Sequence, residues 1–103
     1  MIHLRSIAQT IIDQIYAQNP WALASWGARK YLIEKVDGNV GVSFSVNGTK
    51  TKHGSRILIL YDEQRDLYNV YLYRFYKRQH MYDNQVEGVF FDQLVEIIDD
   101  MVG

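Results

Sequence analysis

The sequence contains no cysteine and only one proline. Without cysteine the chain forms neither disulfides nor thiolate metal sites, and it is compatible with a reducing compartment. Histidine is nearly as scarce, and His3, His53 and His80 lack the spacing of metal ligands. We therefore expect no metal, no cofactor and a cytoplasmic location.

Long apolar runs are missing as well, because none reaches the length of a bilayer-spanning helix. The N-terminal residues lead straight into an amphipathic stretch that Asp13 interrupts, and this is unlike a secretory signal peptide. We expect a protein that makes no contact with a membrane.

Patterns of catalytic chemistry are also absent. The sequence has no G-x-S-x-G elbow, no Walker or dinucleotide-binding loop and no cysteine nucleophile. Asp99 and Asp100 are adjacent carboxylates, but neighbouring residues of a helix point in different directions, so we interpret them as part of a solvated face. We predict that the chain is not an enzyme.

The residues that are present indicate one globular domain over positions 1–103. A length of 103 residues suits a single domain, and 48% hydrophobic with 22% charged residues is the composition of a folded chain. Aromatic residues reach 14%, and the chain has 8 tyrosines. Because tyrosine joins an apolar ring to a polar tip, this enrichment is typical of half-exposed sheets and of binding surfaces.

A first helix is predicted over residues 4–18, and it ends before Pro20, which restricts the residue that precedes it. Ser6 and Gln9 have the spacing of a capping box, so the start of this helix lies between Leu4 and Ser6. Its apolar stripe consists of Leu4, Ile7, Ala8, Ile11, Ile12 and Ile15.

Four strands are predicted next, over residues 22–36, 40–46, 56–61 and 67–76. Asp37-Gly38 is typical of a hairpin turn. Since alternate residues of a strand point to opposite faces, Tyr71, Tyr73 and Phe75 share one face of the last strand. Residues 77–88 are interpreted as a polar loop.

A second helix is predicted over residues 91–102. Its apolar stripe consists of Phe91, Leu94, Val95, Ile98 and Met101, and its polar side carries Asp92, Glu96, Asp99 and Asp100. The whole order predicts an α+β fold, a four-stranded antiparallel meander with the N- and C-terminal helices packed on one face and the other face open.

Charge is distributed unevenly along the chain. The net charge is −1, yet Lys and Arg concentrate in residues 50–80, and residues 81–103 hold carboxylates without any Lys or Arg. Residues 50–56 form a basic connection, and residues 71–78 interleave aromatic with cationic side chains. The candidate binding residues are Lys50, Lys52, His53, Arg56, Tyr71, Tyr73, Arg74, Lys77 and Arg78.

Two interpretations of these residues stay open. Aromatic rings beside Lys and Arg hold single-stranded nucleic acid by stacking and by phosphate contacts. Aromatic rings also pack across neighbouring strands, and cations keep a sheet edge soluble. The near-neutral net charge favours this second, structural interpretation.

Several short motifs follow one another in a recognisable order. Residues 7–15 are similar to the pattern I-A-x-T-I-x-x-Q-I, residues 66–70 to D-x-Y-x-V, and residues 88–94 to G-V-Y-x-D-x-L. In these motifs the chain resembles a family of small uncharacterised phage and prophage proteins. It departs at Trp26 and Arg29, which stand where the family carries T-G-A-K, and in the connection over 47–56. The resemblance implies an origin in a mobile element and assigns no activity to any residue.

Two hypotheses about function follow. The first is a non-enzymatic accessory protein of a phage or mobile element that binds a protein of the phage or the host, for example as an inhibitor of a host defence complex. A sheet face rich in Tyr and Arg suits this hypothesis, because these residues anchor many interfaces. The alternative is binding of RNA or single-stranded DNA through the basic connection and the aromatic strand.

Overall fold

The computed structural model of the chain describes residues 2–103, with side chains from Leu4 onward. The expectation about the His3 side chain therefore lies outside the described residues. The elements in chain order are α1 (Ile2–Gln18), α2 (Ala22–Ser25), β1 (Arg29–Val36), β2 (Asn39–Ser45), β3 (Arg56–Asp62), β4 (Leu67–Tyr76), β5 (Gln79–Val89), the 3₁₀ helix η1 (Phe91–Gln93) and α3 (Leu94–Val102).

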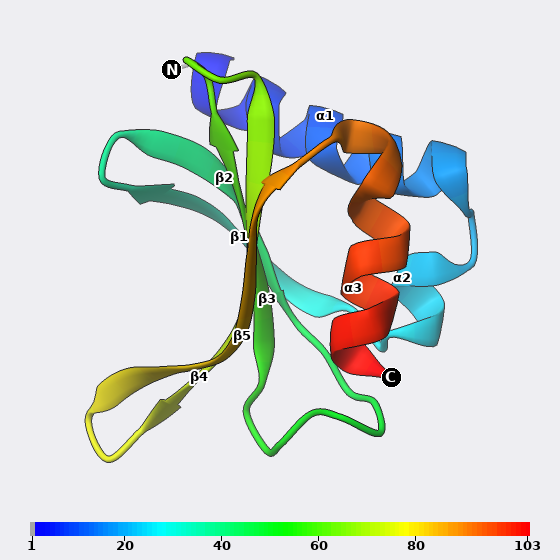
Figure 1. The fold of residues 1–103 in the computed structure, drawn as a ribbon, viewed down its shortest axis with the longest axis vertical. Coiled ribbons are helices and arrows are strands. Elements are labelled where there is room, and N and C mark those ends of the chain that lie inside the picture. The colour runs from blue at the N-terminus through cyan, green and yellow to red at the C-terminus, as the bar shows by residue number, and fades with distance from the viewer. Residues whose placement is uncertain (1) are drawn as a thin grey trace.

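The strands form one antiparallel sheet in the order β1-β2-β3-β4-β5, so each strand pairs with its neighbours in the sequence. Figure 1 views this sheet along its edge and shows α1, α2 and α3 on one side of it. The β1–β2 and β4–β5 hairpins bend toward the opposite side, which we call the open face. The predicted α+β architecture, an antiparallel sheet flanked by N- and C-terminal helices, is confirmed.

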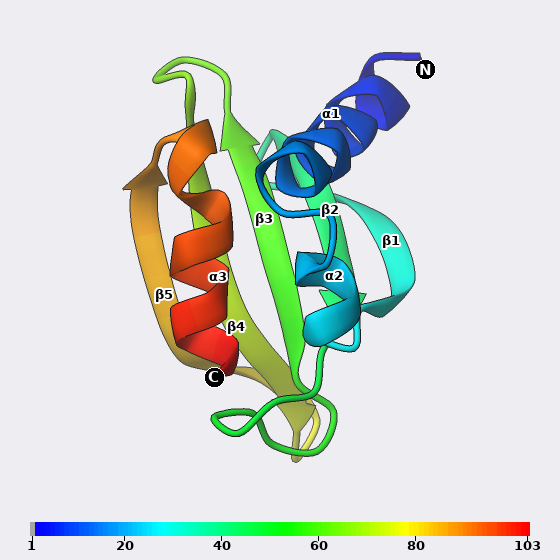
Figure 2. The ribbon, with the colours of Figure 1, turned by 90° about the vertical axis from the view of Figure 1, so that its right-hand side faces the viewer.

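The core lies between the helices and the sheet, where α1 contacts β2 and α3 contacts β4 and β5 (Figure 2). Ile11 and Ile15 of α1 and Leu94 and Ile98 of α3 are fully buried. The sheet residues that pack against the helices occupy alternate positions and include Val42, Phe44, Ile57, Ile59, Val70 and Leu72. Full burial of each such side chain stabilises the fold by about 1.5–3 kcal/mol. The helices therefore pack on the sheet face that carries these apolar residues.

The first predicted strand begins too early, because residues 22–25 form the short helix α2. This turn buries Trp26, which is 2% exposed. The Trp26 ring stacks on Phe44 with ring centroids 6.4 Å apart, and its Nε1 donates to Asp99 at 3.0 Å. Burial and hydrogen bonding of the Trp26 indole outweigh the strand propensity of residues 22–25, because strand propensity depends strongly on context.

The predicted loop over residues 77–88 is wrong, because most of it belongs to the fifth strand, β5. Lys77 and Arg78 alone connect β4 to β5, with φ values of 50° and 68°. Positive φ at both central residues defines a type I′ turn, which Asn-Gly or Asp-Gly usually marks in a sequence. Lys77-Arg78 is neither of these dipeptides, so the turn cannot be recognised from the sequence.

Two details of the predicted helices also differ. Phe91 is 58% exposed instead of buried, because it belongs to η1 and the α-helical spacing starts only at Leu94. The capping box at Ser6 and Gln9 is wrong, since α1 already begins at Ile2 and Gln9 donates instead to Asp13 at 2.9 Å. The rest of the α3 stripe is confirmed, with Leu94, Ile98 and Met101 buried.

The open face contains a small apolar floor of its own. Leu58 and Leu60 of β3 are only 6% and 4% exposed, although they point away from the helices. Beside them Gly41 lets β2 approach β3 closely, because a Cβ at this position would meet the main chain of Ile59. The close approach and the bent hairpins thus shelter the middle of the open face.

Candidate nucleic-acid interface

Five aromatic rings follow one another across β4 and β5 on the open face. Phe75 and Tyr73 both contact His80, with ring centroids 5.4 and 5.6 Å apart. Tyr73 and Tyr71 both contact Tyr82, at 6.1 and 5.7 Å. The rings therefore form a zigzag from Phe75 through His80, Tyr73 and Tyr82 to Tyr71, which we call the aromatic ladder.

The alternation of strand residues puts the ladder on the side away from the helices. In β4 the buried Val70 and Leu72 face the helices, so Tyr71, Tyr73 and Phe75, which the sequence predicts to share a face, point to the other side. His80 and Tyr82 join them because residues paired across antiparallel strands share a face, and they pair with Phe75 and Tyr73.

The outer part of the ladder is exposed. Phe75 is 64% and Tyr82 is 55% exposed, whereas Tyr71 and Tyr73 are partly buried. Residues 74–76 extend beyond the end of β3, so this part of the hairpin pairs only with β5. Figure 1 shows the extension bending toward the open face. Exposed rings in such a position are free to stack on a ligand.

Arg56 is fixed beside the ladder. It pairs directly with Tyr73 across β3 and β4. Its Nη1 donates to Ser45 Oγ at 2.9 Å, and its Nη2 donates to the Lys30 carbonyl at 2.8 Å and to Ser43 Oγ at 2.9 Å. Ser43 donates in turn to Glu34 at 2.6 Å. The guanidinium is thus held rigidly in the row of side chains that contains Tyr73.

The hydrogen bonds of Arg56 leave one donor unused. Its Nε is buried without a hydrogen-bond partner among the described residues. An unpaired buried donor carries a desolvation cost, which the three hydrogen bonds of the Nη atoms offset.

Cationic side chains gather at the end of the sheet where the ladder is exposed. The strands β1, β3 and β5 begin at this end, and β2 and β4 finish there. Most of the 11 Lys and Arg residues of the chain belong to it. They are Arg29, Lys30, Lys50, Lys52, Arg56, Arg74, Lys77 and Arg78, accompanied by His53 and His80.

The opposite end of the sheet is acidic. Its turns carry Asp37, Asp62, Glu63 and Asp66. These carboxylates outnumber the nearby cations Lys35 and Arg65, and Arg65 lies 4.0 Å from Asp62. Glu87 hydrogen-bonds Tyr71, and the pKa of the Tyr71 phenol is raised, first by burial and then by the negative charge of Glu87. Anionic ligands are therefore attracted to the exposed end of the ladder and repelled from its other end.

The structure separates two predicted binding residues from the ladder. Arg74 pairs with Asp83 at 2.9 Å on the other side of the hairpin, and its guanidinium lies 5.1 Å from the Tyr76 ring centroid. Lys77 lies over the same ring, with its Nζ at 5.3 Å. These two cations belong to the back of the hairpin, whereas Arg78 occupies its tip.

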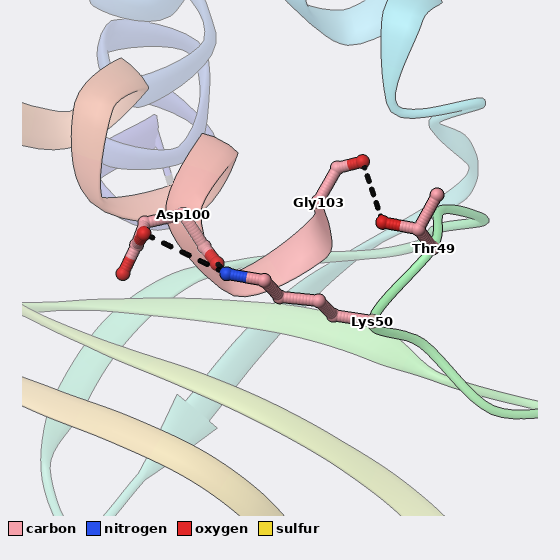
Figure 3. A network of polar contacts seen from close by, with 4 residues as sticks. All are labelled: Thr49, Lys50, Asp100 and Gly103. Carbon is pink, nitrogen blue, oxygen red and sulfur yellow. Dashed lines mark hydrogen bonds and ion pairs between the residues drawn. The ribbon is translucent and has the colours of Figure 1, made fainter.

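Lys50 has a structural role (Figure 3). Its Nζ donates to the Asp100 carbonyl at 3.0 Å and lies 3.7 Å from the Asp100 carboxylate. The Thr49 hydroxyl donates to the Gly103 carbonyl at 3.1 Å. The Lys50 cation and the Thr49 hydroxyl therefore satisfy the C-terminal end of α3, where Asp99 and Asp100 alone would be unfavourable.

Among the described residues, no hydrogen bond, ion pair or ring contact joins the remaining predicted residues, Lys52 and His53, to the ladder. Their connection is tied to the end of α3 through Lys50. Lys52 and His53 are exposed in the connection between β2 and β3, at the cationic end. The sequence interpretation missed His80 and Tyr82, because residues 77–88 were assigned to a loop. The large side chains at alternate positions 80 and 82 were the available signal for a strand face.

Other kinds of site find no counterpart in the described residues. Among the side chains that the structure describes, from Leu4 onward, no group of three or more His, Asp or Glu is arranged to hold a metal ion. None of the described helices is long and apolar enough to cross a bilayer. Comparison of the chain with protein-family models, curated proteins and solved structures finds no match.

Proposed function

We propose that the chain is a non-enzymatic protein that binds single-stranded nucleic acid, either RNA or DNA, on the open face of the β4–β5 hairpin. The observation that carries this proposal is the aromatic ladder, exposed at the cationic end of a sheet face that no described helix covers. Bases stack on such rings, and each stacked base contributes about 1–3 kcal/mol.

The charge arrangement accounts for binding by a chain with a net charge of only −1. The acidic groups lie mostly at the far end of the sheet or pair with cations behind it, as Asp83 does with Arg74. The field near Phe75 and Arg78 is therefore positive although the total charge is close to zero. On this proposal phosphates contact Arg78 at the hairpin tip.

A salt titration tests the proposal. Fluorescence anisotropy is measured with labelled mixed-sequence single-stranded RNA, single-stranded DNA and duplex DNA. We expect both single strands to bind at low salt, with an affinity that falls steeply as salt rises, because phosphate contacts release counterions. Duplex DNA should bind more weakly, since its bases are already stacked. Absence of binding at low salt, or equal binding of the duplex, would contradict the proposal.

Two substitutions on one hairpin give a matched comparison. Phe75 and Tyr76 are adjacent and both exposed, but Phe75 lies on the open face and Tyr76 on the back. Phe75→Ala should therefore weaken binding by about 1–3 kcal/mol. Tyr76→Ala should leave the affinity unchanged. If both variants weaken binding equally, the ligand does not recognise the ladder.

Charge is tested in the same way. Arg78→Ala should weaken binding to all sequences alike and reduce the dependence on salt, because it removes one phosphate contact. Lys35→Ala removes the same charge from the acidic end of the sheet and should change neither. Equal effects of the two substitutions would show that only the total charge matters.

A protein partner is the second candidate, and a different surface favours it. Trp21, Phe90 and Phe91 are 75%, 59% and 58% exposed. Gln18 fixes the end of α1 against η1 and α3, since its Nε2 donates to the Phe91 carbonyl at 2.5 Å and its Oε1 accepts from the Val95 N–H at 3.3 Å. Exposed aromatic residues on a fixed surface are typical anchors of protein interfaces.

Origin in a phage and inhibition of a host defence complex both stay predictions. Affinity capture from a host lysate, with wild-type protein and with a Trp21→Ala variant, tests the second candidate. A stoichiometric protein partner that the variant loses would support it. Recovery of no stoichiometric partner by the folded wild-type protein would count against it.

A further inference from the structure

The two edges of the sheet differ in the side chains they expose. The edge strand β5 exposes Asp83, Asn84, Gln85 and Glu87, which protect it against pairing with another strand. The edge strand β1 exposes large apolar side chains, and Arg29 and Lys30 at its start and Lys35 near its end are also exposed. The apolar side chains are Tyr31 at 45%, Leu32 at 55%, Ile33 at 48% and Val36 at 38%.

An apolar groove runs beside β1. It has a volume of about 290 Å³ and lies between this strand and α1. Arg5 is the one charged residue in its lining. The apolar residues that line it include Ala8, Ile12, Tyr31, Ile33 and Val42. A strand added along β1 would therefore find an apolar groove for the side chains that it turns toward the helices.

The charges along β1 indicate which strand fits. The strand begins at the cationic end with Arg29 and Lys30 and runs into the turn that holds Asp37. A second copy of β1 placed antiparallel to the first brings the cationic start of each strand beside the acidic turn of the other. The cationic end of each whole molecule then also lies beside the acidic end of the other, and this attraction between opposite charges is favourable.

The register of such a pair is also constrained. In a two-fold antiparallel pair one residue of the strand faces its own copy, because paired residues share a face. The regular part of β1 starts at Leu32, since a bulge lies between Arg29 and Leu32. Centring on Glu34 would set two carboxylates opposite each other. Centring on Ile33 sets Ile33 opposite Ile33 and Leu32 opposite Glu34, with no like charges paired.

We infer that β1 is a self-association edge, at which a second copy of this chain pairs antiparallel about Ile33 and extends the sheet across both molecules. The two-fold axis then stands perpendicular to the sheet, so both open faces lie on the same side. Each dimer presents two aromatic ladders to one side, and a single strand that reaches both gains affinity from the second contact. The pairing itself is independent of nucleic-acid binding.

Sedimentation equilibrium over a wide range of protein concentrations, without nucleic acid, tests the inference. The wild-type chain should form a reversible dimer that weakens as salt rises. Ile33→Lys places two cations opposite each other at the centre and should weaken the dimer by more than about tenfold. Gln85→Lys introduces the same charge on the β5 edge and should leave the dimer unchanged.

A cross-linking experiment tests the register and does not depend on how the lysine variant folds. The chain has no cysteine, so Ile33→Cys provides a single thiol. Residues that face each other across antiparallel strands have Cα atoms about 4.5–5.5 Å apart, which suits a disulfide. Mild oxidation should convert Ile33→Cys, but not Gln85→Cys, to a covalent dimer.

Three outcomes would overturn the inference. The first is a chain that stays monomeric at all concentrations. The second is a dimer that survives Ile33→Lys in a variant with a wild-type circular dichroism spectrum. The third is a dimer whose Ile33→Cys variant does not cross-link. A monomeric chain that still binds oligonucleotides would refute self-association alone, whereas a dimer without affinity for oligonucleotides would refute only the proposed function.

Discussion

Arg56 on β3 stands directly opposite Tyr73 on β4, in the row of side chains that crosses the open face. Arg56 donates hydrogen bonds to Ser43 and Ser45 of β2, and Tyr73 contacts the rings of His80 and Tyr82. One cross-strand pair therefore joins the polar half of the open face to its aromatic half.

Arg56→Lys tests that pair. Lysine keeps the charge but lacks the planar fork that reaches three acceptors from one position. We expect an unfolding free energy lower by about 1–3 kcal/mol, because charge-assisted hydrogen bonds are lost. Affinity for single-stranded nucleic acid should fall as well. Urea unfolding and anisotropy measure the two effects, and an unchanged value in both would show that Arg56 is dispensable.

Arg78→Gly should separate stability from binding. Arg78 has a φ of 68°, a conformation that costs a non-glycine residue about 1–2 kcal/mol. Glycine removes this cost, so the variant should unfold at a higher urea concentration while it binds oligonucleotides less tightly. Arg78→Ala is the control, because it removes the charge and keeps the strained backbone. Stabilisation by alanine equal to that by glycine would contradict this explanation.

Leu94→Ala and Glu96→Ala compare the two faces of α3. Leu94 is fully buried, so its truncation should lower the unfolding free energy by about 2–5 kcal/mol through lost transfer energy and the cavity left behind. Glu96 is exposed, and its truncation should cost less than about 0.5 kcal/mol. Urea midpoints at equal m-values measure both, and similar losses would mean that the helix faces are misassigned.

The pair formed by Tyr61 and Asp66 predicts a dependence on alkaline pH. The Tyr61 hydroxyl donates to Asp66 at 2.5 Å, and this hydrogen bond, followed by burial, raises the pKa of the phenol to about 12. Because the pKa is higher in the folded than in the unfolded state, the stabilisation is complete below pH 10.0 and is lost as the pH rises through about 12.

Tyr61→Phe provides the measurement for this pair. The difference in unfolding free energy between wild type and variant should stay constant up to about pH 10 and then shrink. A tyrosinate absorbance titration should lose its most alkaline component in the variant. A Tyr61 that ionises together with the exposed tyrosines would disprove the assignment.

Lys50→Met removes the cation at the end of α3 while it keeps the length of the side chain. The lysine side chain is 58% exposed, so we expect a modest loss of about 0.3–1 kcal/mol that high salt abolishes. Lys52→Met removes an exposed charge from the same connection and should have no effect on stability. Equal losses in both variants would indicate a general charge effect.

Much of this fold follows from the sequence alone. The alternation of residues in β4 predicted that Tyr71, Tyr73 and Phe75 share one face, because backbone geometry imposes a period of two on any strand, and the helices decide that this face is the open one. The spacing of Leu94, Ile98 and Met101 likewise predicted the buried face of α3. Local periodicity was sufficient in both cases, since one face of each element is covered.

Other features were decided only by tertiary structure. The indole of Trp26 packs on Phe44 and bonds to Asp99, contacts distant in sequence that favour α2 over a strand. The strand β5 follows a turn with no glycine or asparagine, so no turn signal marks its start, and its pairing with β4 defines it. That pairing brings His80 and Tyr82 to Tyr73, and pairing with β3 adds Arg56. The candidate site thus depends on strand register, which is set by contacts between segments far apart in the chain.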